Sequence, residues 1–126
     1  MRTEKGFTMI ELVMVIVLLG ILAAVAIPRY LDLSAQALTA SKAGMSGAVK
    51  GAHGIEIARL AAAGTPGYPT VTQLAAAINP EGTAAATGVV VVINGTNYTV
   101  PTYTDATCTT PTAAVGNAVQ CVGNIP

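Results

Sequence analysis

Few side chains in this sequence could carry out catalysis or hold a metal ion. His53 is the only histidine among 126 residues, and Lys50 and Glu56 flank it at three-residue spacing. A solvated or partly packed histidine fits this setting better than a general base does. The sequence contains no G-x-S-x-G motif, P-loop or paired carboxylates. One histidine and two cysteines are too few for a four-ligand zinc site. We therefore predict a protein that is not an enzyme, with no cofactor and no metal.

The two cysteines, Cys108 and Cys121, are separated by twelve residues. A lone pair usually forms a disulfide in an exported protein and remains as two free thiols in a cytosolic one. The N-terminal stretch described below favours export, so we expect the disulfide. Closing a loop of this size stabilises a small fold by about 3 kcal/mol in the chain-entropy model.

The overall composition excludes several classes of protein. Charged residues make up only 10% of the chain and the formal net charge is zero. A nucleic-acid-binding surface needs a basic patch, and none is evident. Between Gly82 and Pro126 the only acidic residue is Asp105, which argues against a calcium site there, because calcium usually needs several oxygen ligands including carboxylates.

The most unusual stretch is residues 7–27, which are mostly apolar and in which only Glu11 carries a charge. A helix of about 20 apolar residues can span a bilayer core. A plain signal anchor is one interpretation. A removable secretory signal is another, with Arg2 and Lys5 in front and cleavage after Ala26. Neither explains a carboxylate inside the run, because a charge deep in a membrane helix costs about 2.5–3.5 kcal/mol.

A third interpretation explains that carboxylate. The run GFTMIEL at residues 6–12 resembles the cleavage and methylation motif of type IV prepilins. This resemblance implies that a prepilin peptidase cuts between Gly6 and Phe7 and that Phe7 is then N-methylated. It also implies that Glu11 neutralises the N-terminal amine of a neighbouring subunit during assembly, with Phe7 and Thr8 beside it. Opposite charges in an apolar filament core must pair, because an unpaired one is heavily penalised.

The resemblance extends to two residues further along. Gly20 and Pro28 stand where many type IVa pilins have a helix-weakening glycine and proline. Glycine costs about 1 kcal/mol in a helix interior, and proline lacks the N–H that a helix needs. We expect three parts: a leader peptide (1–6), a hydrophobic transmembrane and filament-core helix (7–28), and an amphipathic helix with a globular β head (29–126).

Residues 29–63 are expected to continue the helix, so that its N-terminal half would extend beyond the head (residues 64–126). A row of small residues at heptad spacing runs along it. Small residues let another backbone approach closely, so we interpret this row as a seam that packs on the head's sheet or on neighbouring helices. The seam comprises Ala37, Ala40, Gly44, Gly47, Gly51, Gly54 and Ala58.

The head is expected to contain a short helix and a β-hairpin. Residues 71–78 form the helix, with Thr70 as N-cap and Asn79-Pro80 as its stop. Residues 81–88 are expected to be flexible. Asn94-Gly95 between two β-branched runs predicts a type I′ hairpin over 89–100 that ends at Pro101. In that register Ile93 faces Thr96 and Val91 faces Tyr98.

The predicted hairpin alternates, so one face is expected to pack on the helix. That face contains Val89, Val91, Ile93, Tyr98 and Val100. Residues 102–117 are expected to form a Thr-rich loop and 118–122 a weak strand. The fold class is therefore α+β, with the C-terminal half of a long N-terminal helix packed on a small antiparallel sheet, as in the pilin fold. The placement of Cys108 and Cys121 also resembles the C-terminal disulfide-bounded loop of type IVa pilins.

The resemblance implies a major structural subunit of an extracellular type IV pilus, serving adhesion, motility or DNA uptake. Its partners would be copies of itself in a helical homopolymer, the prepilin peptidase and the inner-membrane assembly machinery. It would wait in the bacterial inner membrane before assembly. The run KAGMSGAVKGAHGIEIARLAAAG resembles the mannose-sensitive haemagglutinin class of pilins. Two alternatives remain: a type II secretion pseudopilin or minor pilin, and a soluble secreted binding domain released after Ala26.

Overall fold

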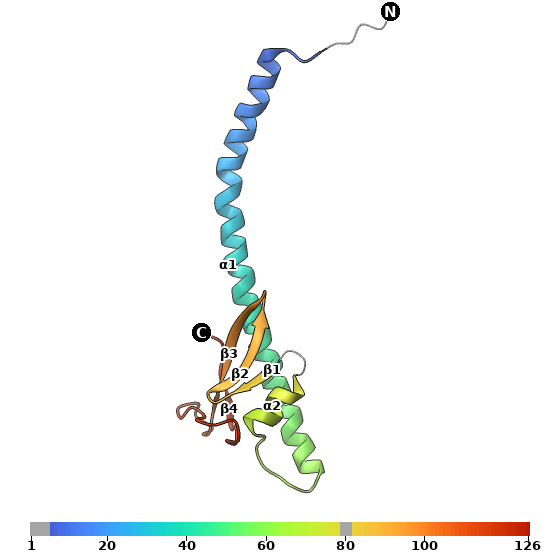
Figure 1. The fold of residues 1–126 in the computed structure, drawn as a ribbon, viewed down its shortest axis with the longest axis vertical. Helices are drawn as coiled ribbons and strands as arrows, with labels where there is room; N and C mark the ends of the chain where they lie inside the picture. The colour runs from blue at the N-terminus through green and yellow to red at the C-terminus, as the bar shows by residue number, and fades with distance from the viewer. Residues whose placement is uncertain (1–5, 79–81) are drawn as a thin grey trace, which may run out of the picture. The chain divides into compact units, whose positions relative to one another are not determined.

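The computed structural model describes residues 6–78 and 82–126 and contains two helices and one four-stranded sheet (Figure 1). The chain divides into two compact units between Ala37 and Leu38, called here the N-terminal and C-terminal units. The expected α+β fold class is confirmed. The elements are, in order, α1 (Met9–Ala62), α2 (Val71–Ala77), β1 (Gly82–Ala85), β2 (Gly88–Ile93), β3 (Thr96–Tyr103) and β4 (Cys121–Val122).

Helix α1 runs without interruption through 54 residues, with Pro28 inside it. At a rise of about 1.5 Å per residue it is about 80 Å long. The predicted continuation beyond Pro28 is therefore confirmed. Proline removes one hydrogen bond from the helix and crowds the carbonyl four residues earlier. The helix nevertheless continues through Pro28. Whether Gly20 and Pro28 weaken the helix during assembly stays a prediction.

The sheet in the C-terminal unit is antiparallel, with the strand order β1-β2-β3-β4. The predicted hairpin register is confirmed, because Ile93 pairs with Thr96 and Val91 with Tyr98. Asn94 and Gly95 have φ angles of 51° and 77°. Both values lie in the left-handed region that a type I′ turn requires at its two central positions. The turn chemistry of these two residues thus sets the register of the sheet.

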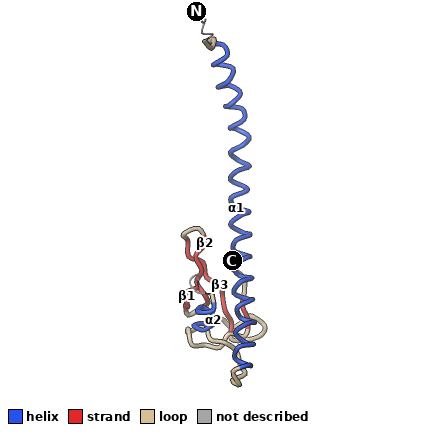
Figure 2. Tube along the Cα trace, turned by 90° about the vertical axis from the view of Figure 1, so that its right-hand side faces the viewer, coloured by secondary structure: helices blue, strands red, loops and turns tan. Residues whose placement is uncertain are grey.

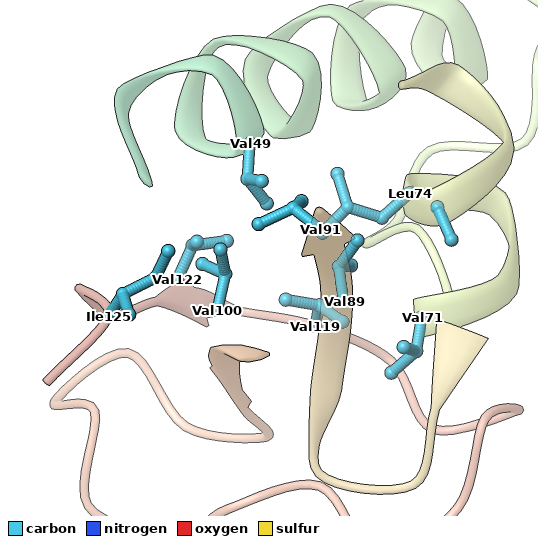
Figure 3. Packing of buried hydrophobic residues seen from close by; sticks show 10 residues of the cluster. Val49, Val71, Leu74, Val89, Val91, Val100, Val119, Val122 and Ile125 are labelled. Atoms are coloured by element: carbon cyan, nitrogen blue, oxygen red, sulfur yellow. The ribbon is translucent and has the colours of Figure 1, made fainter. Parts of the chain in front are cut away.

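The apolar core of the C-terminal unit gathers side chains from α1, α2, the sheet and the last residues of the chain (Figure 3). The face predicted to pack inward does so: Val89, Val91 and Val100 are fully buried, and Ile93 and Tyr98 pack against them. Val49 is the one buried apolar side chain that α1 contributes. The other core residues are Val71, Leu74, Ala75, Val119, Val122 and Ile125.

Two strand predictions were wrong. The Ala-rich stretch expected to be flexible contains β1, which pairs antiparallel with β2; Glu81, at its start, lies outside the described residues. The second error is that β3 continues through Pro101 to Tyr103. Pro101 is tolerated because its polar backbone groups face away from β2. Its carbonyl oxygen accepts from the Gly123 N–H at 2.8 Å, and the N–H and C=O of one residue in an antiparallel strand point to the same neighbour. The N–H that proline lacks is therefore not needed for pairing with β2.

Helix α2 begins at a capping box that the sequence predicts in part. The Thr70 side chain accepts from the Gln73 backbone N–H, and the Gln73 side chain accepts from the Thr70 N–H. The helix ends one residue earlier than expected, with Ile78 as C-cap, and the proposed stop at Asn79-Pro80 lies outside the described residues. Capping matters here because a seven-residue helix has few internal hydrogen bonds.

Loops make up much of the chain after β3 (Figure 2). The predicted loop is present but begins after Tyr103 rather than at residue 102. The weak strand expected at 118–122 is shorter, because only β4 pairs with β3. Ala118 instead forms an isolated bridge with Thr70. The last residues thus bond to several different elements rather than to one strand.

Candidate assembly helix and disulfide loop

The start of α1 is a capping box formed by Thr8 and Glu11. A carboxylate oxygen of Glu11 accepts from the Thr8 backbone N–H at 2.8 Å and from the Thr8 hydroxyl at 2.9 Å. The Thr8 hydroxyl oxygen in turn accepts from the Glu11 N–H at 3.3 Å. Thr8 is therefore the N-cap and Glu11 the third helical residue, the T-x-x-E spacing that satisfies free N–H groups at a helix start.

This capping role is one that the sequence reasoning missed, although the T-x-x-E pattern was there to find. It gives Glu11 a function within a single chain, besides the pairing with a neighbour that the resemblance implies. The cost of a carboxylate in this apolar stretch is offset by two hydrogen bonds from Thr8. Glu11 can serve both purposes in turn, because a carboxylate accepts several hydrogen bonds.

The N-terminal part of α1 displays a long apolar surface that is exposed in the described part of the chain. Every residue from Gly6 to Ser41 is exposed, and Phe7 is 92% exposed. A window of this helix with mean hydropathy 3.0 is long and apolar enough to cross a membrane. An apolar surface this long is unstable in water, so the segment needs lipid or other apolar helices around it.

The predicted site residues fall into two groups. Gly6, Phe7, Thr8 and Glu11 lie at or just before the start of α1, and Gly20 and Pro28 lie further along the same helix. A side chain at Gly20 would meet open space. Glycine is therefore not required there by packing within this chain.

The second group of predicted site residues is the cysteine pair. Cys108 and Cys121 belong to the C-terminal unit. The leader residues 1–5 lie outside the described part of the chain.

The small-residue seam does not pack on the sheet, which excludes one of the two partners that the sequence left open. All seven of its residues are exposed. A Cβ atom added at Gly44, Gly47, Gly51 or Gly54 would find nothing within 4 Å. The reason is geometric: α1 turns the opposite face, with Ser46, Val49 and Glu56, toward the rest of its unit. Packing against neighbouring helices is the alternative that remains.

Gly47→Leu tests that alternative. A Cβ atom at this position meets nothing within 4 Å, and leucine has the higher helix propensity, so folding stability is expected to rise by up to about 1 kcal/mol. Assembly into the filament that the resemblance implies is expected to fall sharply, because leucine would hold two backbones apart. Thermal unfolding and the yield of sheared filaments measure the two effects. Gly47→Ala is the matched control, and normal filaments from the leucine variant would contradict the seam.

The expected disulfide between Cys108 and Cys121 is present, with the two Cα atoms 5.4 Å apart. It joins the loop after β3 to β4, and the turn before it is organised by Asp105. The Asp105 carboxylate accepts from the Thr107 hydroxyl and from the N–H groups of Thr109 and Thr110, the last at 2.6 Å. These bonds enclose Cys108, whose φ of 55° is unusual for a residue other than glycine.

The hydrogen bonds from Thr107 and Thr110 hold the pKa of Asp105 well below its usual range. A carboxyl with a lowered folded-state pKa stabilises the fold fully above its unfolded pKa and loses that contribution as the pH falls through the folded value. Asp105→Asn is therefore expected to destabilise the protein at pH 7 and to matter less near pH 3. Thermal unfolding of both proteins at the two pH values checks this. An equal difference at both would contradict it.

The one histidine has a structural contact. His53 is half-buried, and its Nε2–H donates to the Val119 carbonyl oxygen at 2.8 Å, as expected for a partly packed histidine. One turn further, Glu56 is buried and accepts from Arg59 at 2.8 Å. That hydrogen bond raises the pKa of Arg59. His53 thus joins α1 to Val119, whereas the Glu56–Arg59 pair lies within α1.

The N-terminal segment matches a known family model. Residues 1–27 fit the prokaryotic N-terminal methylation motif. This match covers the leader and the apolar stretch, including the residues of the capping box. It agrees with the resemblance noted in the sequence at residues 6–12.

Several curated proteins are similar to this chain. It is 46% identical over 78 residues to the type IV narrow pilus major component PilA5 of Thermus thermophilus, which covers 62% of this chain and 61% of that protein. It is 48% identical over 44 residues to the type IV major alpha-pilin of Moraxella bovis, covering 35% and 28% of the two chains. The fimbrial protein EcpC of Eikenella corrodens is 45% identical over 51 residues, covering 40% and 33%.

The chain therefore spans about three fifths of the length of the Thermus protein and about a third or less of the other two. No solved structure matches the chain closely enough for comparison. The family model covers the N-terminal apolar segment. Over the matched residues the chain is thus similar to proteins named as type IV pilins and fimbrial proteins.

Proposed function

We propose that this protein is a major structural subunit of an extracellular type IV pilus, with a structural rather than an enzymatic role. The observation that carries the proposal is the exposed apolar segment of α1 with one carboxylate at its start. Such a surface needs lipid before assembly and sister helices afterwards. The methylation motif and the pilin relatives support this interpretation.

In the proposed pathway the subunit is inserted in the bacterial inner membrane as a prepilin. The prepilin peptidase cuts after Gly6 and N-methylates Phe7. The assembly machinery then moves the subunit into a helical homopolymer outside the cell. Glu11 leaves its bonds to Thr8, or adds to them, to neutralise the amine of a neighbouring Phe7. Gly20 and Pro28 allow the helix between them to lengthen as it leaves the membrane.

Mass spectrometry of the mature N-terminus tests the processing step. The expected product begins at Phe7 and carries one methyl group on its amine. A mature chain that begins at Ile27 would instead support a soluble domain released after Ala26. An uncleaved chain that begins at Met1 would support a plain signal anchor. Either of these results would refute the proposal.

The abundance of the protein in sheared filaments tests the structural role. A major pilin is expected to account for most of the filament mass, whereas a minor pilin is a small fraction of it. A pseudopilin of type II secretion is the other relative within the same class. Recovery of filaments that contain only traces of this chain would overturn the major-subunit assignment while leaving the processing step intact.

A further inference from the structure

Four polar side chains on one face of α1 reach the last residues of the chain, all within the C-terminal unit. They lie at Lys42, Ser46, Lys50 and His53, with helical spacings of four, four and three. Residues at such spacings share one face of a helix. We call these four residues the polar clasp, and residues 119–126 the strap.

Each member of the clasp has a partner in the strap. The Lys42 ammonium donates to the Pro126 carbonyl oxygen at 2.7 Å, and the Lys50 ammonium donates to the Asn124 side-chain oxygen at 2.6 Å. His53 donates to the Val119 carbonyl oxygen at 2.8 Å. The helix therefore holds the strap at its first residue and at its last three.

Ser46 is the member whose contact is most protected from water. Only 1% of it is exposed. Its hydroxyl donates to the Lys42 carbonyl oxygen at 2.8 Å and accepts from the Ile125 N–H at 3.0 Å. Without Ser46 the Ile125 N–H would be buried with no partner, which is among the costlier defects in a folded protein.

The strap also joins α1 to the sheet. Its Gln120 and Gly123 N–H groups donate to the carbonyl oxygens of Tyr103 and Pro101 on β3, at 2.9 and 2.8 Å. Val119, Val122 and Ile125 line the same core as Val49 of α1 (Figure 3). The strap is therefore bonded to the helix on one side and to β3 on the other.

From these contacts we infer that the strap fastens α1 to the sheet and that it opens as a unit before the β2–β3 hairpin unfolds. Its only regular structure is the two-residue β4, so it has few ladder bonds of its own. It depends instead on the clasp and on the disulfide at Cys121. Segments with few internal bonds open with the lowest free energy. This inference does not depend on the proposed function.

Hydrogen exchange followed by mass spectrometry, on the processed full-length chain in detergent micelles, tests the inference. Ser46→Ala removes one buried hydrogen bond, so strap amides such as those of Gly123 and Ile125 are expected to exchange about tenfold faster. The β2–β3 amides are expected to change less than twofold. Ser34→Ala is the matched control, because Ser34 is exposed in the N-terminal unit.

A second variant guards against a general loss of folding. Lys50→Met keeps the aliphatic stem but removes the donor to Asn124, and Arg29→Met is its control for the lost charge. It is expected to raise exchange in the strap alone, by about threefold. Reduction of the disulfide is expected to raise strap exchange more in either clasp variant than in the wild type. The reason is that the reduced wild type still has the complete clasp, whereas each variant has lost one of its contacts.

Two results would overturn the inference. Equal acceleration in the strap and in the β2–β3 hairpin would show that the strap does not open separately. Unchanged strap exchange in both clasp variants would show that the clasp does not hold it.

Discussion

Replacing Glu11 with Gln is expected to leave the subunit folded and processed but to reduce pilus yield by about a hundredfold or more. The reason is the charge that the proposed pairing needs. A neighbouring N-terminal amine would enter the apolar filament core without a carboxylate beside it. Removing one partner of a buried ion pair costs about 3–5 kcal/mol, which is enough to prevent assembly.

The choice of Gln separates the two roles of this residue. Gln can still accept from the Thr8 N–H, because the capping box works with Glu or Gln at its last position. Glu11→Gln therefore keeps the cap and loses only the charge. Glu11→Ala loses both. Thr8→Val, in contrast, removes the hydroxyl of the cap and keeps the carboxylate, and it is expected to lower pilus yield only slightly.

The measurements are filament yield after shearing and the mass of the mature N-terminus. Asp32→Asn serves as the control, because it removes a negative charge from the same helix outside the apolar stretch and is expected to assemble normally. Wild-type yield from Glu11→Gln would refute the pairing role. If Glu11→Gln assembled and Glu11→Ala did not, capping would be the contribution of this residue.

Gly88→Ala is expected to destabilise the C-terminal unit by about 2–4 kcal/mol. Gly88 begins β2, where the neighbouring strand passes so closely that no side chain fits. A Cβ atom placed there would lie 2.1 Å from the Val100 carbonyl oxygen and 3.0 Å from the Pro101 Cα atom. Both are backbone atoms of β3, so relief requires the two strands to separate and the core behind Val89 to loosen.

Thermal unfolding followed by the near-ultraviolet signal of the tyrosines measures this effect. A loss of this size is expected to lower Tm by about 10 °C or more for a unit of fewer than 100 residues. Gly116→Ala is the matched control, because a Cβ atom there meets nothing within 4 Å. Similar Tm values for the Gly88 and Gly116 variants would contradict the close approach of β2 and β3.

The features that were predicted correctly depend on residues close together in the sequence. Asn94-Gly95 favours a turn with two positive φ angles, and that turn alone sets the register of the hairpin. Thr70 caps α2 through a bond to a residue three positions later. The Thr8–Glu11 cap belongs to the same kind. The T-x-x-E spacing of these two residues is a local signal of the same kind.

The incorrect predictions depend on pairing partners that the propensity of a stretch does not reveal. Alanine-rich β1 has little strand propensity of its own, and it becomes a strand because β2 offers a free edge. Pro101 would end an isolated strand, yet the strap gives its carbonyl a partner in Gly123. The partner of the small-residue seam was left open by the sequence, and the structure excludes the sheet. Small residues mark a face suited to close approach, but they do not say which partner approaches it.

The sequence alone determined the apolar segment, its processing motif, the lone carboxylate, the long helix and the hairpin register. Each of these follows from composition or from bonds that span only a few residues. Tertiary structure alone decided that the glycine seam faces outward and that the strap fastens α1 through Ser46 and its neighbours. Those outcomes depend on which backbone groups, far apart in the sequence, need hydrogen-bond partners once the core has formed. Local propensity does not predict them.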